Sequence, residues 1–191
     1  APDHHFSTPP YNTFEQMLSD LDTTEITIPT EPLTTDWRQV NFLLKQLSEG
    51  KSISWPDYQQ LFENEDTYLV FLSDYVEDVK RRVGMATLCI THSPTGSKAW
   101  VEDVVIDQAF RGRGLSHRLI ACMKLKAAEK GIKKIMLTSR PARVAANRLY
   151  QEEGFARRET NVYAFEVKTE DMEEYRQKTM GQGLKRVGKV E

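Results

Sequence analysis

The chain has few cysteines, no long apolar run and almost no net charge, and each of these absences excludes a class of protein. Its two cysteines among 191 residues, Cys89 and Cys122, lack the spacing of metal ligands and stand in apolar runs. We therefore expect reduced thiols in a cytoplasmic protein, with no disulfide framework and no metal site. No apolar stretch approaches the length of a membrane span, and Ala1–His5 lacks the basic-then-apolar order of a signal peptide. A net charge of -2 leaves no excess of positive charge to coat nucleic acid.

The length of the chain and the composition of its ends predict one globular domain between two tails. With 39% hydrophobic residues, 191 residues can build one core but not two. Residues 1–24 are an expected leader, partly flexible, in which Tyr11–Leu21 has the spacing of one short helix. Residues 169–191 are charged and then rich in Gly and Lys, so we expect a loose tail. The folded domain is expected to span residues 25–168.

Apolar periodicity and capping residues predict an α/β (α+β) mixture, with an antiparallel half followed by a crossover half. Helices are expected to begin with Thr35 or Asp36 as N-cap, at Ser54, at Leu115 and at Arg143. Strands are expected at Glu25–Ile28, Thr67–Leu72, Val83–Thr91, Ala99–Ile106, Ile132–Thr138 and Asn161–Val167. The polar segment Ser73–Arg82 suits a long hairpin loop, and Ser93–Gly96 suits a tight turn.

The most informative motif is Phe-Arg-Gly-Arg-Gly-Leu-Ser at residues 110–116, between an apolar strand run and a long helix run. A glycine turn that opens a helix presents free backbone N–H groups to a pyrophosphate. A dinucleotide-binding fold needs a Gly where this chain has His117, and a phosphate-loop nucleotidase needs a Gly-Lys-Ser/Thr that is absent. The pattern Gln/Arg-x-x-Gly-x-Gly/Ala of coenzyme A sites is approached by Arg111, Gly114 and Ser116. A purely structural turn is the alternative.

A second block, Ala146–Phe155, contains Leu-Tyr and Gly-Phe at a characteristic interval. The two blocks together resemble the Gcn5-related N-acetyltransferase (GNAT) superfamily in order and separation, and the resemblance covers Val83–Phe165 well. It departs from the family at Ser116, where Gly or Ala is usual, and at Arg143, where Asn is frequent. The resemblance implies a GNAT fold, with a mixed, mostly antiparallel central sheet whose middle strands splay apart and which helices flank.

The resemblance also implies acetyl-CoA as cosubstrate, with no metal. In the family, one strand holds the pantetheine arm through backbone groups, and the glycine turn holds the pyrophosphate. Asn147 is a candidate replacement for the missing Asn at 143, and a solvated surface pair is the alternative reading of Arg111 and Arg113. The expected cofactor-binding residues are Val104, Val105, Ile106, Arg111, Gly112, Arg113, Gly114, Leu115, Ser116 and Asn147.

Two residues are the expected catalytic groups under the resemblance. Tyr150 stands where the family has a tyrosine that protonates the departing thiolate, and a phenol with a pKa near ~10 is protonated at neutral pH. Glu102 is the candidate base for the amine, because strand alternation places it on the face of Val104 and Ile106, with Asp103 on the opposite face. Asp103 or a chain of water molecules is the alternative base.

The leading expectation is therefore an N-acetyltransferase that moves an acetyl group from acetyl-CoA to a primary amine of a small molecule, by direct attack in a ternary complex. The alternatives are a protein lysine or N-terminal acetyltransferase and a non-catalytic acyl-CoA sensor. A cationic acceptor would be attracted by the acidic cluster Glu63, Glu65 and Asp66, and an anionic one by Arg157 and Arg158. We expect a monomer or homodimer without nucleic-acid or membrane partners.

Overall fold

The computed structural model describes residues 23–179, and the described chain divides into two compact units at the bond between Ala156 and Arg157. The expected helix at Tyr11–Leu21 lies outside the described residues. None of the helices between residues 23 and 179 is both long and apolar enough to cross a membrane.

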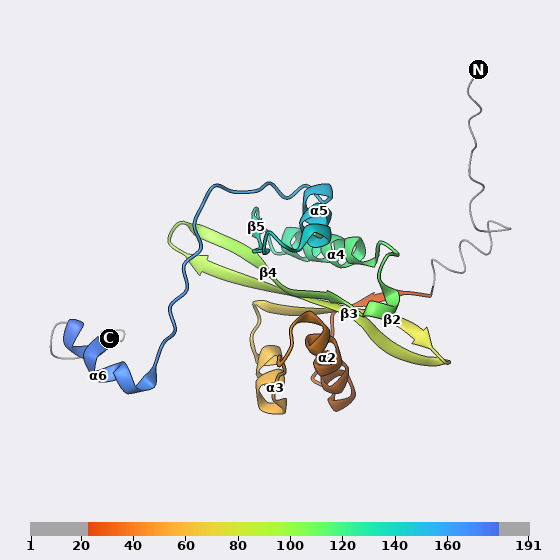
Figure 1. Ribbon diagram of the computed structural model, residues 1–191, viewed down its shortest axis with the longest axis horizontal. Coiled ribbons are helices and arrows are strands. Elements are labelled where there is room, and N and C mark those ends of the chain that lie inside the picture. The colour runs from red at the N-terminus through yellow and green to blue at the C-terminus, as the bar shows by residue number, and fades with distance from the viewer. Residues whose placement is uncertain (1–22, 180–191) are drawn as a thin grey trace, which may run out of the picture. The chain divides into compact units, whose positions relative to one another are not determined.

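The first unit is built on a five-stranded sheet whose strands follow one another in chain order (Figure 1). Every pair of neighbours is antiparallel except the last, in which β4 and β5 run parallel. This confirms the expected mixed, mostly antiparallel sheet. The strands are β1 (Glu25–Thr27), β2 (Thr67–Val76), β3 (Val79–Ser93), β4 (Gly96–Ile106) and β5 (Ile135–Met136).

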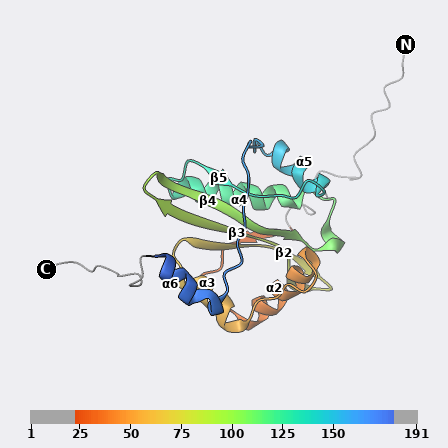
Figure 2. The same ribbon diagram turned by 60° about the vertical axis from the view of Figure 1, so that its left-hand side comes forward.

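Helices cover both faces of the sheet, and two views agree on the layers (Figures 1 and 2). One face carries α2 (Thr34–Leu47) and α3 (Trp55–Glu63), and the other carries α4 (Leu115–Glu129) and α5 (Val144–Glu152). Strand residues alternate between the two resulting cores, because successive side chains of a strand point to opposite faces. Leu72 and Leu88 belong to the core under α4, whereas Phe71 and Met85 belong to the core under α2 and α3.

The start of α2 differs from the prediction. Leu33 is the N-cap and has no side-chain cap, so neither Thr35 nor Asp36 caps this helix. Asp36 instead lies buried in the first turn, where its Oδ1 accepts from Arg82 Nε at 3.0 Å. A buried carboxylate requires such a partner, so Asp36 ties α2 to β3. The predicted start of α3 at Ser54 is confirmed, and the Ser54 side chain caps the helix, since its Oγ accepts from the N–H of Asp57 at 3.3 Å.

The hairpin of β2 and β3 is longer than predicted, and the expected loop Ser73–Arg82 was wrong. The strands continue to Val76 and restart at Val79, leaving Glu77 and Asp78 as a two-residue turn with φ values of 50° and 62°. Left-handed conformations at both central positions define the tight turn that matches strand twist. Without an Asn-Gly or Asp-Gly pair, the sequence carries only a weak signal for it.

Two expected strands in the second half are short or absent. The predicted strand Ile132–Thr138 is reduced to Ile135–Met136, and within residues 23–179 no strand forms at Asn161–Val167. Tyr163 is 86% exposed, so its alternating segment lacks the neighbour that would bury one face. The second unit holds instead η2 (Thr169–Asp171) and α6 (Met172–Lys178) inside the expected tail. The domain end at residue 168 stays a prediction.

Candidate active site

The glycine turn lies between the end of β4 and the start of α4. Asp107 begins the short η1 helix (Gln108–Phe110), since its Oδ1 accepts from the N–H of Ala109 at 3.1 Å. Gly112 and Gly114 then take φ values of 80° and 70°, in the left-handed region that favours glycine. A Cβ at Gly112 would meet nothing within 4 Å, so backbone conformation and not crowding requires this glycine.

The backbone N–H groups from Gly112 to Ser116 are free within the described chain. None of them donates to a backbone carbonyl or to a side chain of residues 23–179, and the first backbone bond after the turn is from His117 N–H to Gly114 O at 3.2 Å. Gly114, the N-cap of α4, has no side chain to satisfy these donors. A run of unpaired N–H groups at the positive end of a helix of this length is suited to bind an anion.

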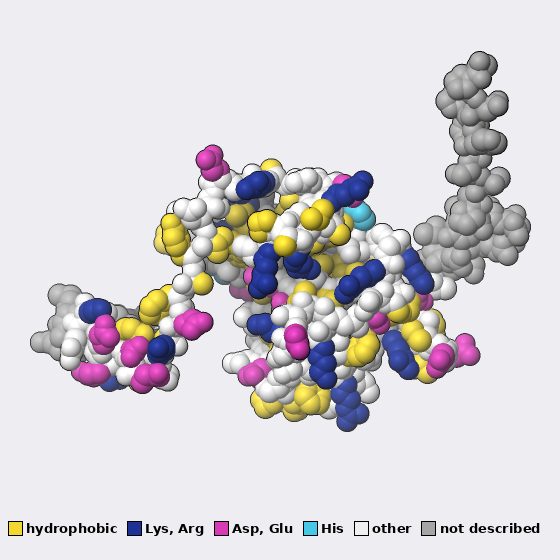
Figure 3. Space-filling view, in the orientation of Figure 1, with side chains coloured by type: hydrophobic (Ala, Val, Ile, Leu, Met, Phe, Trp, Pro, Cys, Tyr) yellow, Lys and Arg dark blue, Asp and Glu magenta, His cyan; other side chains and the backbone are white. Residues whose placement is uncertain are grey.

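The two arginines of the turn are held differently. Arg111 Nε donates to the carbonyl of Ile106 at 2.9 Å, which folds this side chain back over the end of β4. The guanidinium of Arg113 lies 5.0 Å from the ring centroid of Phe110. In the space-filling view, basic side chains lie over the region between β4 and α4 (Figure 3). Both arginines are exposed, so their charges remain available to a ligand.

The edge of β4 beside the turn is open. β4 pairs with β5 only at Ala99 and Trp100, so from Val101 to Ile106 its edge away from β3 has no strand partner in the described chain. This is the splay expected of the middle strands. Val105 and Ile106 are buried, at 5% and 7% exposure, while their backbone lies along this edge. An extended ligand arm can therefore pair with the backbone as an added strand.

A bulge in β4 changes the face on which Glu102 lies. Met85 pairs with Val105 and Thr87 with Glu102, so β4 has one residue more than β3 between these pairs. Asp103 lies in this interval with a φ of 51°, which is unusual for a residue with a side chain. A bulge of this kind resets the alternation of side chains along the strand.

The predicted face of Glu102 was therefore wrong. Val101 belongs to the core under α4, so Glu102 and its cross-strand partner Thr87 point to the opposite face, toward α2 and α3. Beyond the bulge, Val104 and Ile106 pack on the α4 side again. Residues two apart in a regular strand share a face, but the extra residue of the bulge lies between Glu102 and Val104, so these two side chains lie on opposite faces.

The carboxyl of Glu102 has properties that suit a base. Burial, with the Asp103 carboxylate as the second cause, raises the pKa of Glu102 above its ordinary value. Glu102 in turn contributes, after burial, to the raised pKa of the Cys89 thiol. The side chain of Glu102 is exposed on the α2 and α3 face, and its carboxylate there binds a proton more readily than an ordinary glutamate does.

Tyr150 lies on the other face, in the core under α4. It is 7% exposed, and its ring packs edge-on against Phe155 with centroids 6.0 Å apart. Burial raises the pKa of Tyr150, although nearby Arg143 opposes the shift. The phenol is therefore protonated at neutral pH. Its hydroxyl makes no hydrogen bond with any residue from 23 to 179, so its proton is free to be donated to a ligand.

The side chain of Asn147 is already engaged. Its Nδ2 donates to the carbonyls of Arg140 at 2.9 Å and Pro141 at 3.4 Å, which fixes the loop before α5. Arg143 is the N-cap of that helix without a side-chain cap bond. Only the amide oxygen of Asn147 remains to bind a cofactor. The binding role of Asn147 stays a prediction, and it would rest on this one atom.

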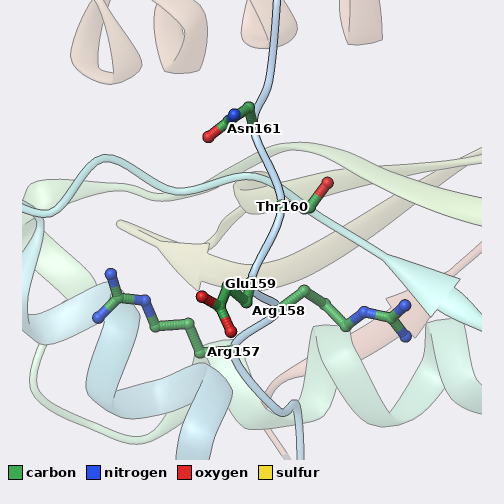
Figure 4. Close-up of a pocket in the computed structure, with 5 residues that line it drawn as sticks. All are labelled: Arg157, Arg158, Glu159, Thr160 and Asn161. Carbon is green, nitrogen blue, oxygen red and sulfur yellow. The ribbon is translucent and has the colours of Figure 1, made fainter.

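Two surface hollows are lined by charged residues that were expected to attract an acceptor. One, of about 490 Å³, is lined by Arg157–Asn161, but the guanidinium groups of Arg157 and Arg158 point in opposite directions and do not converge on one ligand (Figure 4). The other, of about 660 Å³, runs along α3 and the start of β2. Its lining combines apolar Ile53 and Leu61 with acidic side chains, namely Asp57, Glu63 and Glu65.

Among residues 23–179, no group of three or more His, Cys, Asp or Glu side chains is placed to hold a metal ion.

The family model described as "Acetyltransferase (GNAT) family" matches residues 33–155, which include the glycine turn and α5. The chain matches none of the curated proteins.

Solved acetyltransferase structures share this fold. A Trypanosoma brucei acetyltransferase is 23% identical, with a TM-score of 0.61 over 74% of this chain and 99% of that one. Glucosamine-6-phosphate N-acetyltransferase from Arabidopsis thaliana is 19% identical, with a TM-score of 0.61 over 75% and 99%. AAC(6')-Iy in complex with the bisubstrate analogue CoA-S-monomethyl-acetylneamine is 18% identical, with a TM-score of 0.62 over 75% and 98%. At these identities the likeness shows the fold alone.

Proposed function

Because the chain belongs to the acetyltransferase (GNAT) family, we propose that it transfers an acetyl group from acetyl-CoA to a primary amine of a small molecule. The observation that carries the proposal is the run of unpaired N–H groups from Gly112 to Ser116 beside the open edge of β4. The turn is suited to the diphosphate of the coenzyme and the strand edge to its pantetheine arm. One family neighbour is bound to a coenzyme A analogue, which agrees with this assignment.

The acyl donor supplies a thioester, and the chain supplies the groups that move protons. Glu102 accepts a proton from the ammonium form of the acceptor, and the neutral amine then attacks the acyl carbon. As the carbon–sulfur bond breaks, Tyr150 donates its proton to the thiolate, and the proton that the acylated nitrogen loses restores the phenol. The base and the acid lie on opposite faces of the sheet, so the proposal places the acyl group at the open edge of β4, where no strand separates the two faces. Direct attack needs no metal and no covalent enzyme intermediate.

A cationic acceptor is favoured by the α3 hollow, whose acidic side chains Asp57, Glu63 and Glu65 border the face that carries Glu102. Neighbours of the same fold include aminoglycoside and glucosamine-phosphate acetyltransferases, which also favours small amines over protein substrates. The free cysteines Cys89 and Cys122 agree with a cytoplasmic enzyme.

The test is a thiol-release assay with acetyl-CoA and a panel of amines that includes aminoglycosides, polyamines, amino sugars and lysine peptides. We expect acceptor-dependent release of coenzyme A with a small polyamine or amino sugar. If coenzyme A is released with lysine peptides alone, the protein is a protein acetyltransferase and the proposed small-molecule acceptor is wrong. Tight coenzyme binding without release from any acceptor would favour a sensor.

Glu102 gives a prediction for the pH dependence of the reaction. A base must be deprotonated, so we expect kcat/KM to fall as the pH drops through the raised pKa of Glu102, above the ordinary value of 4.5. Glu102→Gln should remove this limb and lower kcat/KM by roughly 10²-fold.

Asp103→Asn is the matched control for Glu102→Gln. Asn tolerates a left-handed φ and removes only the charge, so the acidic limb should move to lower pH while the rate at neutral pH stays similar. If Asp103→Asn abolishes the limb and Glu102→Gln leaves it, Asp103 is the base instead.

A further inference from the structure

A network of polar side chains joins the two helices that carry the cofactor turn and Tyr150. Glu153, the residue that follows α5, is bound from two positions on α4. His117 Nδ1 lies 2.5 Å from its Oε1, and Lys124 Nζ donates to its Oε2 at 2.7 Å. The same ammonium also donates to the backbone carbonyl of Glu153 at 2.5 Å, so Lys124 holds the main chain as well as the side chain.

The network lies between the two parts of the candidate site. His117 is in the first turn of α4, and its N–H bonds to Gly114 in the glycine turn. Glu153 is three residues after Tyr150, at the end of the helix that carries it. Phe155 N–H donates to Tyr150 O at 2.9 Å, and the Phe155 ring packs against the Tyr150 ring. Fixing the end of α5 therefore fixes the backbone and the ring neighbour of Tyr150.

These contacts of Glu153 with His117 and Lys124 form what we call the clamp, in which the acidic partner is the least exposed member. Glu153 is only 18% exposed in its side chain, which limits the screening that weakens isolated surface pairs. Hydrogen bonds from Lys124 and then His117 lower the pKa of Glu153, so it is ionised throughout the neutral range. Lys124 Nζ also lies 5.8 Å from the ring centroid of Phe155, the ring that packs against Tyr150. Networks of several charged hydrogen bonds resist solvent better than single pairs.

We propose that Glu153 is a positioning residue for Tyr150: held by His117 and Lys124 from α4, it sets the distance between the phenol and the sulfur of a coenzyme bound at the glycine turn. The proposal rests on the proposed function, since it assigns the proton donation to Tyr150. The turn and the phenol belong to different helices, so their separation depends on what joins those helices. A misplacement of about 1 Å is enough to reduce turnover by about 10²-fold.

The test is a double-mutant cycle of Glu153→Gln and Tyr150→Phe, measured as kcat and as KM for acetyl-CoA. Glu153→Gln keeps the shape of the side chain and removes its charge, so we expect kcat to fall about tenfold with KM unchanged within about twofold. In the Tyr150→Phe background, the same substitution should have no further effect on kcat, because there is no phenol left to position. Equal losses in both backgrounds, a change confined to KM, or no change would overturn the proposal.

Two further variants separate positioning from general destabilisation. Lys124→Gln weakens the clamp from α4 without altering α5, and it should reproduce the kcat loss of Glu153→Gln without adding to it. It also serves if Glu153→Gln fails to fold. Glu129→Gln is the matched control, because Glu129 pairs at 2.9 Å with Lys126 on the same helix and with no other element of the described chain. It should leave kcat unchanged, and a comparable loss there would contradict a specific role for Glu153.

Amide hydrogen exchange of residues 144–155, measured without substrate, separates failure of this inference from failure of the proposed function. Glu153→Gln should speed exchange at the end of α5 while the rest of the sheet keeps its protection. If the wild type releases no thiol, the function fails and exchange alone decides whether the clamp exists. If Tyr150→Phe remains fully active, the acid role and the positioning role both fail, and unchanged exchange overturns the clamp itself.

Discussion

Replacing Gly114 by glutamate should abolish coenzyme binding, with an increase in Kd of at least about 10²-fold. The substitution places a carboxylate where we place the diphosphate, and like charges a few ångströms apart at a protein surface repel by about 4 kcal/mol. It also forces a residue with a side chain to a φ of 70°, which costs roughly 1–2 kcal/mol and disturbs the turn. Isothermal titration of coenzyme A into each protein measures the effect.

Gly114→Ala separates charge from backbone strain. Its Cβ would meet only His117 Cδ2, at 3.9 Å, so alanine adds the conformational strain without a clash or a charge. We expect a loss of less than about tenfold in affinity for this variant. If Gly114→Glu keeps its affinity for coenzyme A and has a normal melting temperature, the diphosphate does not bind at the turn.

Tyr150→Phe should lower kcat by about 10²-fold or more while the Kd for coenzyme A changes by less than about twofold. General acid catalysis contributes roughly 10²–10⁴-fold, and the account gives this role to the phenol alone. Phenylalanine keeps the ring that packs against Phe155, so the core under α4 should stay intact. Steady-state kinetics and calorimetry on the same preparation separate turnover from binding.

Tyr68→Phe is the control for Tyr150→Phe. Its hydroxyl donates to the Glu65 carbonyl at 2.8 Å, away from the glycine turn, so its removal should leave kcat unchanged. Full activity of Tyr150→Phe would show that another group or a water molecule protonates the thiolate.

The parts of the fold that could be predicted are those that depend on residues close together in the sequence. The glycine turn was predicted because left-handed positions favour Gly112 and Gly114, and the two helices beside it follow from apolar periodicity. The cap of α3 at Ser54 is equally local. Family membership then followed from two short blocks in one order, and residues 33–155 match the family model.

The remaining features depend on contacts between distant segments. The face of Glu102 is set by a bulge at Asp103, which appears only when β4 pairs with β3, and no residue type in the strand marks it. Asp36 looked like a cap because Asp favours that position, but its buried pairing with Arg82 crosses 46 residues of sequence. The link between His117 and Glu153 likewise crosses 36 residues between two helices, so spacing along the chain gives no sign of it.

The most direct test of the central claim is a crystal structure of this protein with coenzyme A. We expect the diphosphate within hydrogen-bond distance of the N–H groups from Gly112 to Ser116, the pantetheine arm along the open edge of β4, and the sulfur within reach of the Tyr150 hydroxyl. A coenzyme bound elsewhere, or a sulfur that points away from Tyr150, would contradict it.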